Sequence, residues 1–299
     1  MTIDSAIHSW LGPATAGALA RTIPPPMLRR MAAPLARGFA ARHARGRVCE
    51  TIRHNQAMVR GVSPDHRAVD LAVTEVLVNA ALGFVDLYST VARGRRAVRA
   101  ACHIDEEVRR RGEECLEAGR GMVLVGPHMV GFELLILGFG LMGYDAQALS
   151  DPRPTGSHRC ENAARRRFGL HTTPVSRSSI AEAETSLERN GVVLTGVDIP
   201  TPHGETLPFF GRAARMPTLH AQLAIRHGSP VLLAVPRRDG DNQYRVEIGG
   251  VFVSTAGDVT PSRVKELTVA VLSATEAVIA SRPDHWKMLR RVWPERMQP

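Results

Sequence analysis

An alternation of short apolar runs with polar, helix-compatible stretches, beginning at Gly121, constrains the fold of this chain more than any other feature. In order, the segments are MVLV, GFELLILGFGLM, DAQAL, GSHRCENAARRRFG, TTPV, SIAEAETSLERNG and VVLTGV. Such alternation is typical of an α/β sheet with helices on its faces, and binding sites in that fold class gather at the carboxyl ends of strands. We therefore predict an α/β fold with a central mixed, mostly parallel sheet flanked by helices.

The rest of the chain extends this prediction in both directions. Strands are expected at 206–210, 229–236 and 244–248, the last at a sheet edge, with helices at 216–227 and 261–282. Before residue 119 the apolar spacing is helical, over 27–45, 50–60, 65–93 and 105–118. We expect a single domain over 1–299, with 1–118 as a helical N-terminal layer and 119–299 as the α/β catalytic part.

Composition narrows the class of partner. The chain has 299 residues and is 44% hydrophobic, which is enough for a sizeable core. Lys and Arg outnumber Asp and Glu by 38 to 29, so the surface suits acidic partners such as phospholipid head groups, phosphopantetheine carriers, coenzyme A or nucleic acid. Aromatic residues make up 5%, and no helix-turn-helix, zinc-knuckle or RNP-like pattern accompanies the basic clusters. No nucleic acid partner is expected.

The four cysteines, at positions 49, 102, 115 and 160, form no CxxC pair. This spacing indicates buried thiols in a reducing compartment, and no metal site is expected. The N-terminal stretch lacks a basic region ahead of its apolar run and is interrupted by Pro13 and Arg21, so it predicts neither a signal peptide nor a spanning helix.

Residues 27–47 place apolar side chains at helical spacing among several arginines; the apolar positions are Leu28, Met31, Leu35 and Phe39. An interfacial helix lying on anionic lipid has this pattern. An ordinary surface helix packed on the core has it as well, and both interpretations stay open at this point.

His128 and Glu133 are the candidate catalytic pair. The strand-like run 122–125 is broken by Gly126 and Pro127, so His128 should lie in a turn ahead of the apolar segment 131–142. On one continuous helix, residues five apart point about 140° apart, so the pair meets more easily if Glu133 occupies the first turns of that helix. A neutral imidazole held by a carboxylate can take a proton from a hydroxyl. The spacing alone also fits a structural or solvated pair.

Six segments carry a resemblance to a known family. They are GRGMVLVGPHMVGFEL, DPRPTGSHRCENAARRRFG, GVVLTGVD, LPFFGRAARMP, LAIRHGSPVLLAVPRR and RPDHWKMLRRVWPE. In this order they resemble the lipid A biosynthesis lauroyl/myristoyl acyltransferases and the related mycobacterial phosphatidylinositol mannoside acyltransferases, over residues 50–296.

The resemblance implies roles for single residues. His128 matches the general base of the family and Glu133 its charge-relay partner in an HxxxxE motif. Arg153 and Arg165 match substrate-binding arginines, suited to a phosphate or carbonyl oxygen, although a surface ion pair fits each of them equally well. Asp198 matches the acid after the VVL strand and is a further substrate-binding candidate. Both His128 and Asp198 follow predicted strands.

The LPFFG segment matches a second site loop of the family. Phe210, Gly211 and Arg212 are the substrate-binding candidates here, because a glycine permits close backbone approach and the expected helix at 216–227 would direct its N-terminus at an anion. For Phe209 and Phe210, packing in the core is the favoured role, because buried aromatic side chains usually serve packing. Residues 134–137 are candidates for the wall of an acyl-chain pocket, or for core packing.

The resemblance implies an O-acyltransferase that moves a fatty acyl group from an acyl-CoA or acyl-carrier-protein thioester to a hydroxyl of a lipid or glycolipid. The acyl thioester serves as cosubstrate, with no cofactor and no metal. Peripheral binding to an anionic membrane surface is expected, at the cytoplasmic face of the inner membrane. Two alternatives remain: a soluble or carrier-bound natural-product acceptor, and a non-catalytic lipid-binding relative.

Overall fold

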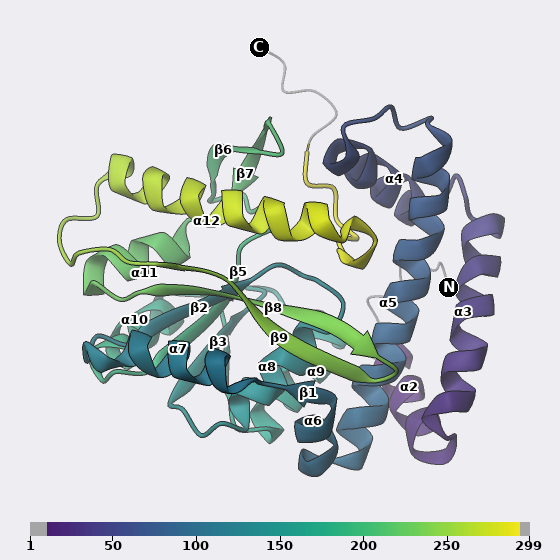
Figure 1. Ribbon diagram of the computed structural model, residues 1–299, viewed down its shortest axis with the longest axis horizontal. Helices are drawn as coiled ribbons and strands as arrows, with labels where there is room; N and C mark the ends of the chain where they lie inside the picture. The colour runs from purple at the N-terminus through teal and green to yellow at the C-terminus, as the bar shows by residue number, and fades with distance from the viewer. Residues whose placement is uncertain (1–10, 294–299) are drawn as a thin grey trace.

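A seven-stranded sheet forms the centre of the molecule in a computed structural model that describes residues 11–293 (Figure 1). Across the sheet the order is β1 (Cys102–His103), β9 (Gln243–Phe252), β8 (Val231–Gly240), β2 (Met122–Gly126), β5 (Val192–Gly196), β3 (Ala146–Ser150) and β4 (His171–Pro174). Strand β9 runs antiparallel to β8, and the other neighbours are parallel. The predicted mixed, mostly parallel sheet is confirmed.

Both faces of the sheet are covered by helices, as predicted. One face carries α7 (Glu106–Glu117), α8 (Phe132–Gly140) and α9 (Gly156–Arg167), and the other carries α10 (Arg177–Glu188), α11 (Leu219–His227) and α12 (Pro261–Ser281). Strand β2 shows why a continuous apolar run is needed here. Met122 and Leu124 join the core on the α8 face, whereas Val123 and Val125 join the core under α10 to α12. Alternating side chains of a strand point to opposite faces, so both must be apolar.

The N-terminal layer consists of α2 (Leu11–Thr22), α3 (Pro25–Arg42), α4 (Arg47–Arg60), α5 (Arg67–Arg93) and α6 (Arg95–Ala101), which confirms a helical layer and adds α2 and α6 to the expected helices. These helices stand beside one end of the sheet (Figure 1). By length and composition, α5 could cross a membrane, but it packs against α2, α3, α4 and α6. The buried Arg29 of α3 and Tyr244 of β9 both bind the carboxylate of Asp86 on α5.

The segment after β5 differs from the prediction. The helix expected at 216–227 begins only at Leu219, as α11, and Met216 instead ends β7 (Arg212–Met216), which pairs with β6 (Glu205–Phe209) in an antiparallel hairpin. The reason is the alternation in RAARM, where Ala214 and Met216 are buried and Arg215 between them is exposed. At the other end of the sheet, β9 is longer than expected, and β1 pairs with its outer side at two positions.

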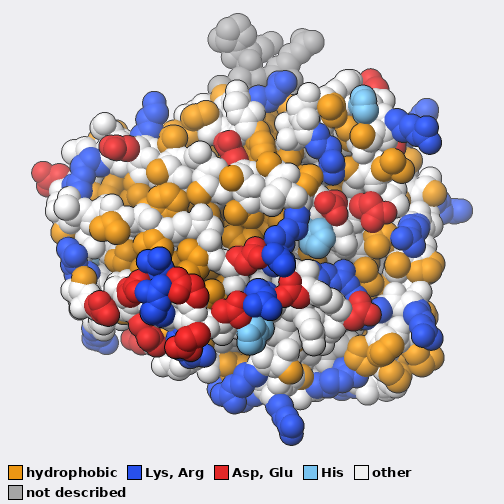
Figure 2. Space-filling model, in the orientation of Figure 1, with side chains coloured by type: hydrophobic (Ala, Val, Ile, Leu, Met, Phe, Trp, Pro, Cys, Tyr) orange, Lys and Arg blue, Asp and Glu red, His pale blue; other side chains and the backbone are white. Residues whose placement is uncertain are grey.

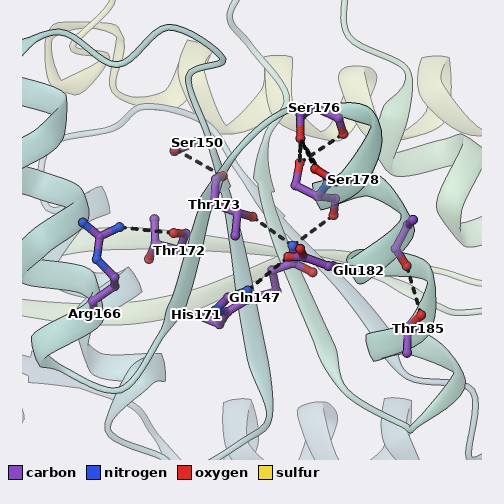
Figure 3. Close-up of polar contacts among 12 residues, drawn as sticks. Gln147, Ser150, Arg166, His171, Thr172, Thr173, Ser176, Ser178, Glu182 and Thr185 are labelled. Atoms are coloured by element: carbon purple, nitrogen blue, oxygen red, sulfur yellow. Dashed lines mark hydrogen bonds and ion pairs between the residues drawn. The ribbon is translucent and has the colours of Figure 1, made fainter.

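Polar contacts fix strands β3 and β4 to each other and to α10 (Figure 3). The buried Gln147 of β3 donates to Thr173 Oγ1 at 2.9 Å and to the Ser179 carbonyl at 3.0 Å. Ser150, the last residue of β3, donates to the Thr173 carbonyl at 3.3 Å. These bonds fix the direction in which the chain leaves β3. The residues that follow, including Asp151 and Arg153, lead toward the candidate site.

Candidate active site

His128 lies where the sequence placed it, in the turn between β2 and α8, with Glu133 in the first turn of that helix. Gly131 makes the turn possible. Its φ of 93° is unfavourable for other residues, and a Cβ at this position would lie 2.3 Å from the ring of Tyr244. The turn thus presents His128 at the carboxyl edge of the sheet.

The carboxylate bound to His128 is Asp198. Gly126 pairs with Gly196 in the parallel β2–β5 ladder, so residues two positions beyond each strand end lie side by side. His128 Nδ1 is 2.6 Å from Asp198 Oδ1, and the backbone N–H of His128 donates to Oδ2 at 2.8 Å. The indole N–H of Trp286 donates to the same Oδ2 at 2.7 Å.

The electrostatics of Asp198 favour its ionised form. The side chain is fully buried, which by itself raises the pKa of a carboxyl group. The charge and hydrogen bonds of His128, together with the bond from Trp286, outweigh burial and hold the pKa of Asp198 below its usual value. An ionised carboxylate can only accept, so Nδ1 of His128 carries the proton and Nε2 is left with a free lone pair.

The imidazole of His128 lies against the end of β5 and faces a groove. A Cβ on Gly196 would stand 2.8 Å from His128 Cε1, so the absence of a side chain there lets this edge of the ring approach the strand. The side chain is 26% exposed, and within residues 11–293 nothing forms a hydrogen bond to Nε2. This nitrogen is accessible to a substrate hydroxyl.

Glu133 does not orient His128, contrary to the expectation from the HxxxxE spacing. Its two oxygens accept from Arg165 of α9, at 2.6 Å from Nη2 and 3.1 Å from Nε. Both side chains are nearly buried. Burial opposes ionisation of Glu133, but the charge and hydrogen bonds of Arg165 outweigh it and lower the pKa of this carboxyl group. Glu133 lies in the first turn of α8, and its side chain reaches Arg165 of α9 instead of the imidazole.

The groove beside His128 has a volume of about 1330 Å³. Its deeper wall is apolar and comes from the sheet and α8; it includes Leu124, Leu149, Leu194, Leu135 and Ile136. Of the four residues predicted as an acyl-chain wall, only Leu135 and Ile136 line the groove, while Leu134 and Leu137 pack in the core under α5. The rim is polar and mostly basic; it includes Arg47, Arg153, Lys287, Arg290 and Arg291. An apolar interior beside a basic rim suits an acyl chain attached to an anionic head.

The remaining predicted site residues fall into two groups. Arg153 is exposed on the groove rim, and its backbone N–H donates to Asp151. Phe210, Gly211 and Arg212 form the tip of the β6–β7 hairpin and do not line the groove. Phe210 and Gly211 have φ values of 50° and 69°, as a tight hairpin turn requires. Phe210 packs edge-on against Trp293, with 6.1 Å between the ring centroids. No role was assigned from the sequence to Trp286, Lys287 or Glu161, although all three lie in two of the quoted segments.

In the described part of the chain, no set of three or more His, Cys, Asp or Glu side chains is arranged to hold a metal ion. Three of the four cysteines are buried and Cys160 is half-buried, all as free thiols. Burial raises the pKa of the Cys102 thiol to about 12, which leaves it unreactive at neutral pH.

Comparison with known proteins gives two findings. The model of the bacterial lipid A biosynthesis acyltransferase family matches residues 2–295. A phosphatidylinositol mannoside acyltransferase from Mycolicibacterium smegmatis is 28% identical over 186 residues, which cover 60% of this chain and 58% of that protein. The match thus spans less than two thirds of the length of this curated relative.

Proposed function

Because this chain belongs to the bacterial lipid A biosynthesis acyltransferase family, we propose that it transfers a fatty acyl group from a thioester to a hydroxyl of a lipid or glycolipid, with His128 as the base. One observation carries the proposal: an imidazole whose Nδ1 is bound by a buried carboxylate presents its other nitrogen to an apolar groove with a basic rim. A protein that only bound lipid would not need that pairing.

The chemical steps follow from the geometry. His128 Nε2 takes the proton of the acceptor hydroxyl as its oxygen attacks the thioester carbonyl carbon. The carbon–sulfur bond then breaks, and the imidazolium returns the proton to the departing thiolate. Asp198 keeps the Nδ1–H tautomer and stabilises the imidazolium between these events. The products are an ester and a free thiol, and no covalent enzyme intermediate is needed.

The acyl donor carries phosphate whether it is acyl-CoA or acyl-carrier protein, and the groove rim supplies the matching charge. Lys287 lies on the rim with its Nζ 4.7 Å from the ring of Phe84, and Arg153 is exposed opposite the sheet edge. A basic rim favours an anionic donor or an anionic lipid head group. We assign the apolar wall around Leu135 and Ile136 to the acyl chain.

The Glu133–Arg165 ion pair is assigned a structural role at the site. Both residues line the groove, but each satisfies the charge of the other, so we propose that they fix α8 to α9 rather than take part in proton transfer. Phe210 of the hairpin is likewise assigned a packing role, through Trp293, and Gly211 a role in the hairpin turn.

A peripheral membrane contact fits the exposed side of α3. Met27, Met31 and Leu35 recur every four residues and are 53%, 51% and 68% exposed, and Leu19 of α2 is 48% exposed. Hydrophobic side chains gather at the lower right of Figure 2, over the end of the molecule where α2 and α3 meet. Exposed arginines at 30 and 37 flank the stripe. This combination favours binding to anionic lipid, which we place at the cytoplasmic face of the membrane.

Product analysis by mass spectrometry tests the catalytic proposal. The purified protein is incubated with acyl-CoA and acyl-carrier-protein thioesters of several chain lengths and with lipid, glycolipid and soluble hydroxyl acceptors. We expect an ester product from wild type that His128→Ala abolishes. If wild type and His128→Ala give the same products, the mechanism is wrong; lipid binding without any product would favour a non-catalytic lipid-binding protein.

Vesicle sedimentation tests the membrane contact. Wild type is expected to sediment with anionic phospholipid vesicles more than with zwitterionic ones, and the double substitution Met31→Asp and Leu35→Asp should reduce this binding. Val253→Asp is the matched control, because Val253 is 76% exposed but follows β9, outside the α3 stripe. Equal binding by all three proteins would contradict the assignment.

A further inference from the structure

The segment after α12 lies against the turn that carries His128. We call residues 283–293 the C-terminal strap; it begins with the 3-10 helix η1 (Pro283–His285). Met129 and Trp286 form an antiparallel bridge. The N–H of Val130 donates to the His285 carbonyl at 2.8 Å, and the N–H of Lys287 donates to the His128 carbonyl at 2.9 Å. The strap and the catalytic turn are therefore joined through backbone bonds on both sides of Trp286.

From this position Trp286 reaches the carboxylate behind the base. It is 1% exposed, does not line the groove, and donates from Nε1 to Asp198 Oδ2 at 2.7 Å. The backbone N–H of His128 reaches the same oxygen, and the imidazole holds the other one. Three donors thus prevent the carboxylate of Asp198 from rotating, and Trp286 is the one among them that belongs to a separate part of the chain.

The indole itself is held by an aromatic cluster. The ring centroid of Phe209, at the end of β6, lies 6.3 Å from that of Trp286 and 5.7 Å from that of Trp293. The ring centroids of the two tryptophans are 6.3 Å apart. Trp293 resembles Trp286 in burial and environment, but its Nε1 donates to the Phe209 carbonyl at 3.0 Å. Residues 11–293 therefore contain two buried indole donors, one bound to the carboxylate of Asp198 and one bound to the backbone.

The strap is fixed in turn by the N-terminal layer. Asn55 of α4, 1% exposed, donates to the carbonyls of Met288 and Arg290 at 3.2 and 2.8 Å and accepts from the N–H of Val292 at 3.2 Å. Gln56 donates to the Pro283 carbonyl at 2.7 Å. A single buried amide that makes three backbone bonds sets the path of the strap.

We propose that Trp286 is a positioning residue for the acyl-transfer base: its indole N–H holds the Asp198 carboxylate in the plane that orients His128, and α4 holds Trp286 through the strap. The proposal rests on the proposed function above. On this proposal, the C-terminal strap and the helical layer help to orient His128, although Trp286 touches no substrate.

Steady-state kinetics of Trp286→Phe and Trp293→Phe separate this role from packing, because both variants lose one indole hydrogen bond in the same cluster. A hydrogen bond to a charged group contributes enough for a loss of about 10- to 100-fold in kcat in Trp286→Phe, with KM nearly unchanged because Trp286 is outside the groove. In Trp286→Phe, the acidic limb of the pH–rate profile should move to higher pH by about 1 pH unit. The Asp198 carboxylate loses one stabilising hydrogen bond and therefore holds the proton that it shares with His128 more tightly. Trp293→Phe should keep the wild-type profile.

If Trp286→Phe does not fold, benzothienylalanine at position 286 keeps the shape of the ring and replaces its N–H by sulfur. Equal kcat and equal pH profiles for the variants at 286 and 293 would overturn the inference while leaving the acyltransferase proposal intact.

A readout that needs no activity separates the two proposals. The chain has three tryptophans, so its indole N–H signals can be assigned in nuclear magnetic resonance spectra with the two variants. The Trp286 signal should shift with the same pH midpoint as the His128 ring, and the Trp293 signal should not. A Trp286 signal that ignores this titration contradicts the inference, whereas a coupled signal in a protein that forms no ester sustains it and refutes the proposed function.

Discussion

Two buried carboxylates lie at the groove, and they differ in the kind of nitrogen group that each one binds. Asp198 holds an imidazole and Glu133 holds a guanidinium, and in both cases the shortest nitrogen–oxygen distance is 2.6 Å. An imidazole gains and loses a proton near neutral pH, whereas a guanidinium stays charged. The same local geometry therefore gives a pair that can move a proton at the end of β5 and a pair that can only hold α8 to α9.

The largest expected effect comes from exchanging Asp198 for its amide. In Asp198→Asn the side-chain NH₂ can donate to His128 Nδ1, which favours the tautomer with its proton on Nε2 and removes the acceptor needed for base catalysis. We expect kcat to fall about 10⁴-fold, as for the equivalent change in a serine protease triad, with the protein still folded. Steady-state kinetics with the best thioester and acceptor measure this.

Glu133→Gln is the matched control, since it makes the same chemical change in the other pair. If Glu133 only holds Arg165, kcat should fall less than about 10-fold in the folded fraction. An Asp198→Asn variant that retains activity, together with an inactive but folded Glu133→Gln, would reverse the roles assigned to the two carboxylates.

Arg165→Met should show that the second pair contributes to stability. Removing the guanidinium leaves Glu133 ionisable, nearly buried and without its partner, which costs about 3–5 kcal/mol of unfolding free energy. The double variant Glu133→Gln with Arg165→Met should recover most of that loss, because it leaves no buried charge. Urea denaturation of the three proteins gives the values, and additive effects of the two substitutions would contradict a direct ion pair.

Local pattern was enough to predict the part of the site that lies within one strand and turn. MVLV followed by Gly126 and Pro127 places His128 at a sheet edge and Glu133 in the next helix, as the structure confirms. What the pattern could not supply is which strand lies beside β2. That neighbour is β5, about 70 residues later, and the contact between His128 and Asp198 depends on this long-range register.

A signal for the correct partner was nevertheless present. His128 stands two residues after the strand that ends at Gly126, and Asp198 stands two residues after the strand that ends at Gly196. Equal offsets beyond parallel strands place side chains together, whereas a spacing of five along one segment does not. The strand Arg212–Met216 was missed because its alternation of buried and exposed residues is short, and its last residue, Met216, was assigned to the start of the helix expected at 216–227.

Gly196→Ala tests the pocket of the base without altering any polar group. The new Cβ would lie 2.8 Å from His128 Cε1, so the ring must tilt and weaken its bond to Asp198. Misplacing a catalytic group by a fraction of an ångström should lower kcat about 10- to 100-fold, with a loss of stability of about 1–3 kcal/mol. Gly38→Ala on α3, where a Cβ meets nothing within 4 Å, is the control. Wild-type kcat in Gly196→Ala would contradict the contact with the ring.

The smallest effect concerns a third carboxylate, Glu161 of α9, which lines the same groove without a cation bound to it. Burial, together with the nearby charge of Glu133, raises the pKa of Glu161 to about 7 against the opposing charges of Lys287, Arg165 and His128. The ordinary value is 4.5, so between these two pH values the folded protein holds a proton that the unfolded chain has released. The contribution of Glu161 to stability is therefore fully present below pH 4.5 and is lost as the pH rises through 7.

Glu161→Gln stays neutral at every pH and should avoid that loss. Because solvent in the groove reaches part of the side chain, we expect the variant to gain about 1–2 kcal/mol relative to wild type between about pH 5 and pH 8.5, less than the full shift in pKa implies. Thermal unfolding at the two pH values measures the difference. A gain in stability that is the same at both pH values would mean that Glu161 is ionised at both. Arg165 would then neutralise the charge of Glu161 as well as that of Glu133.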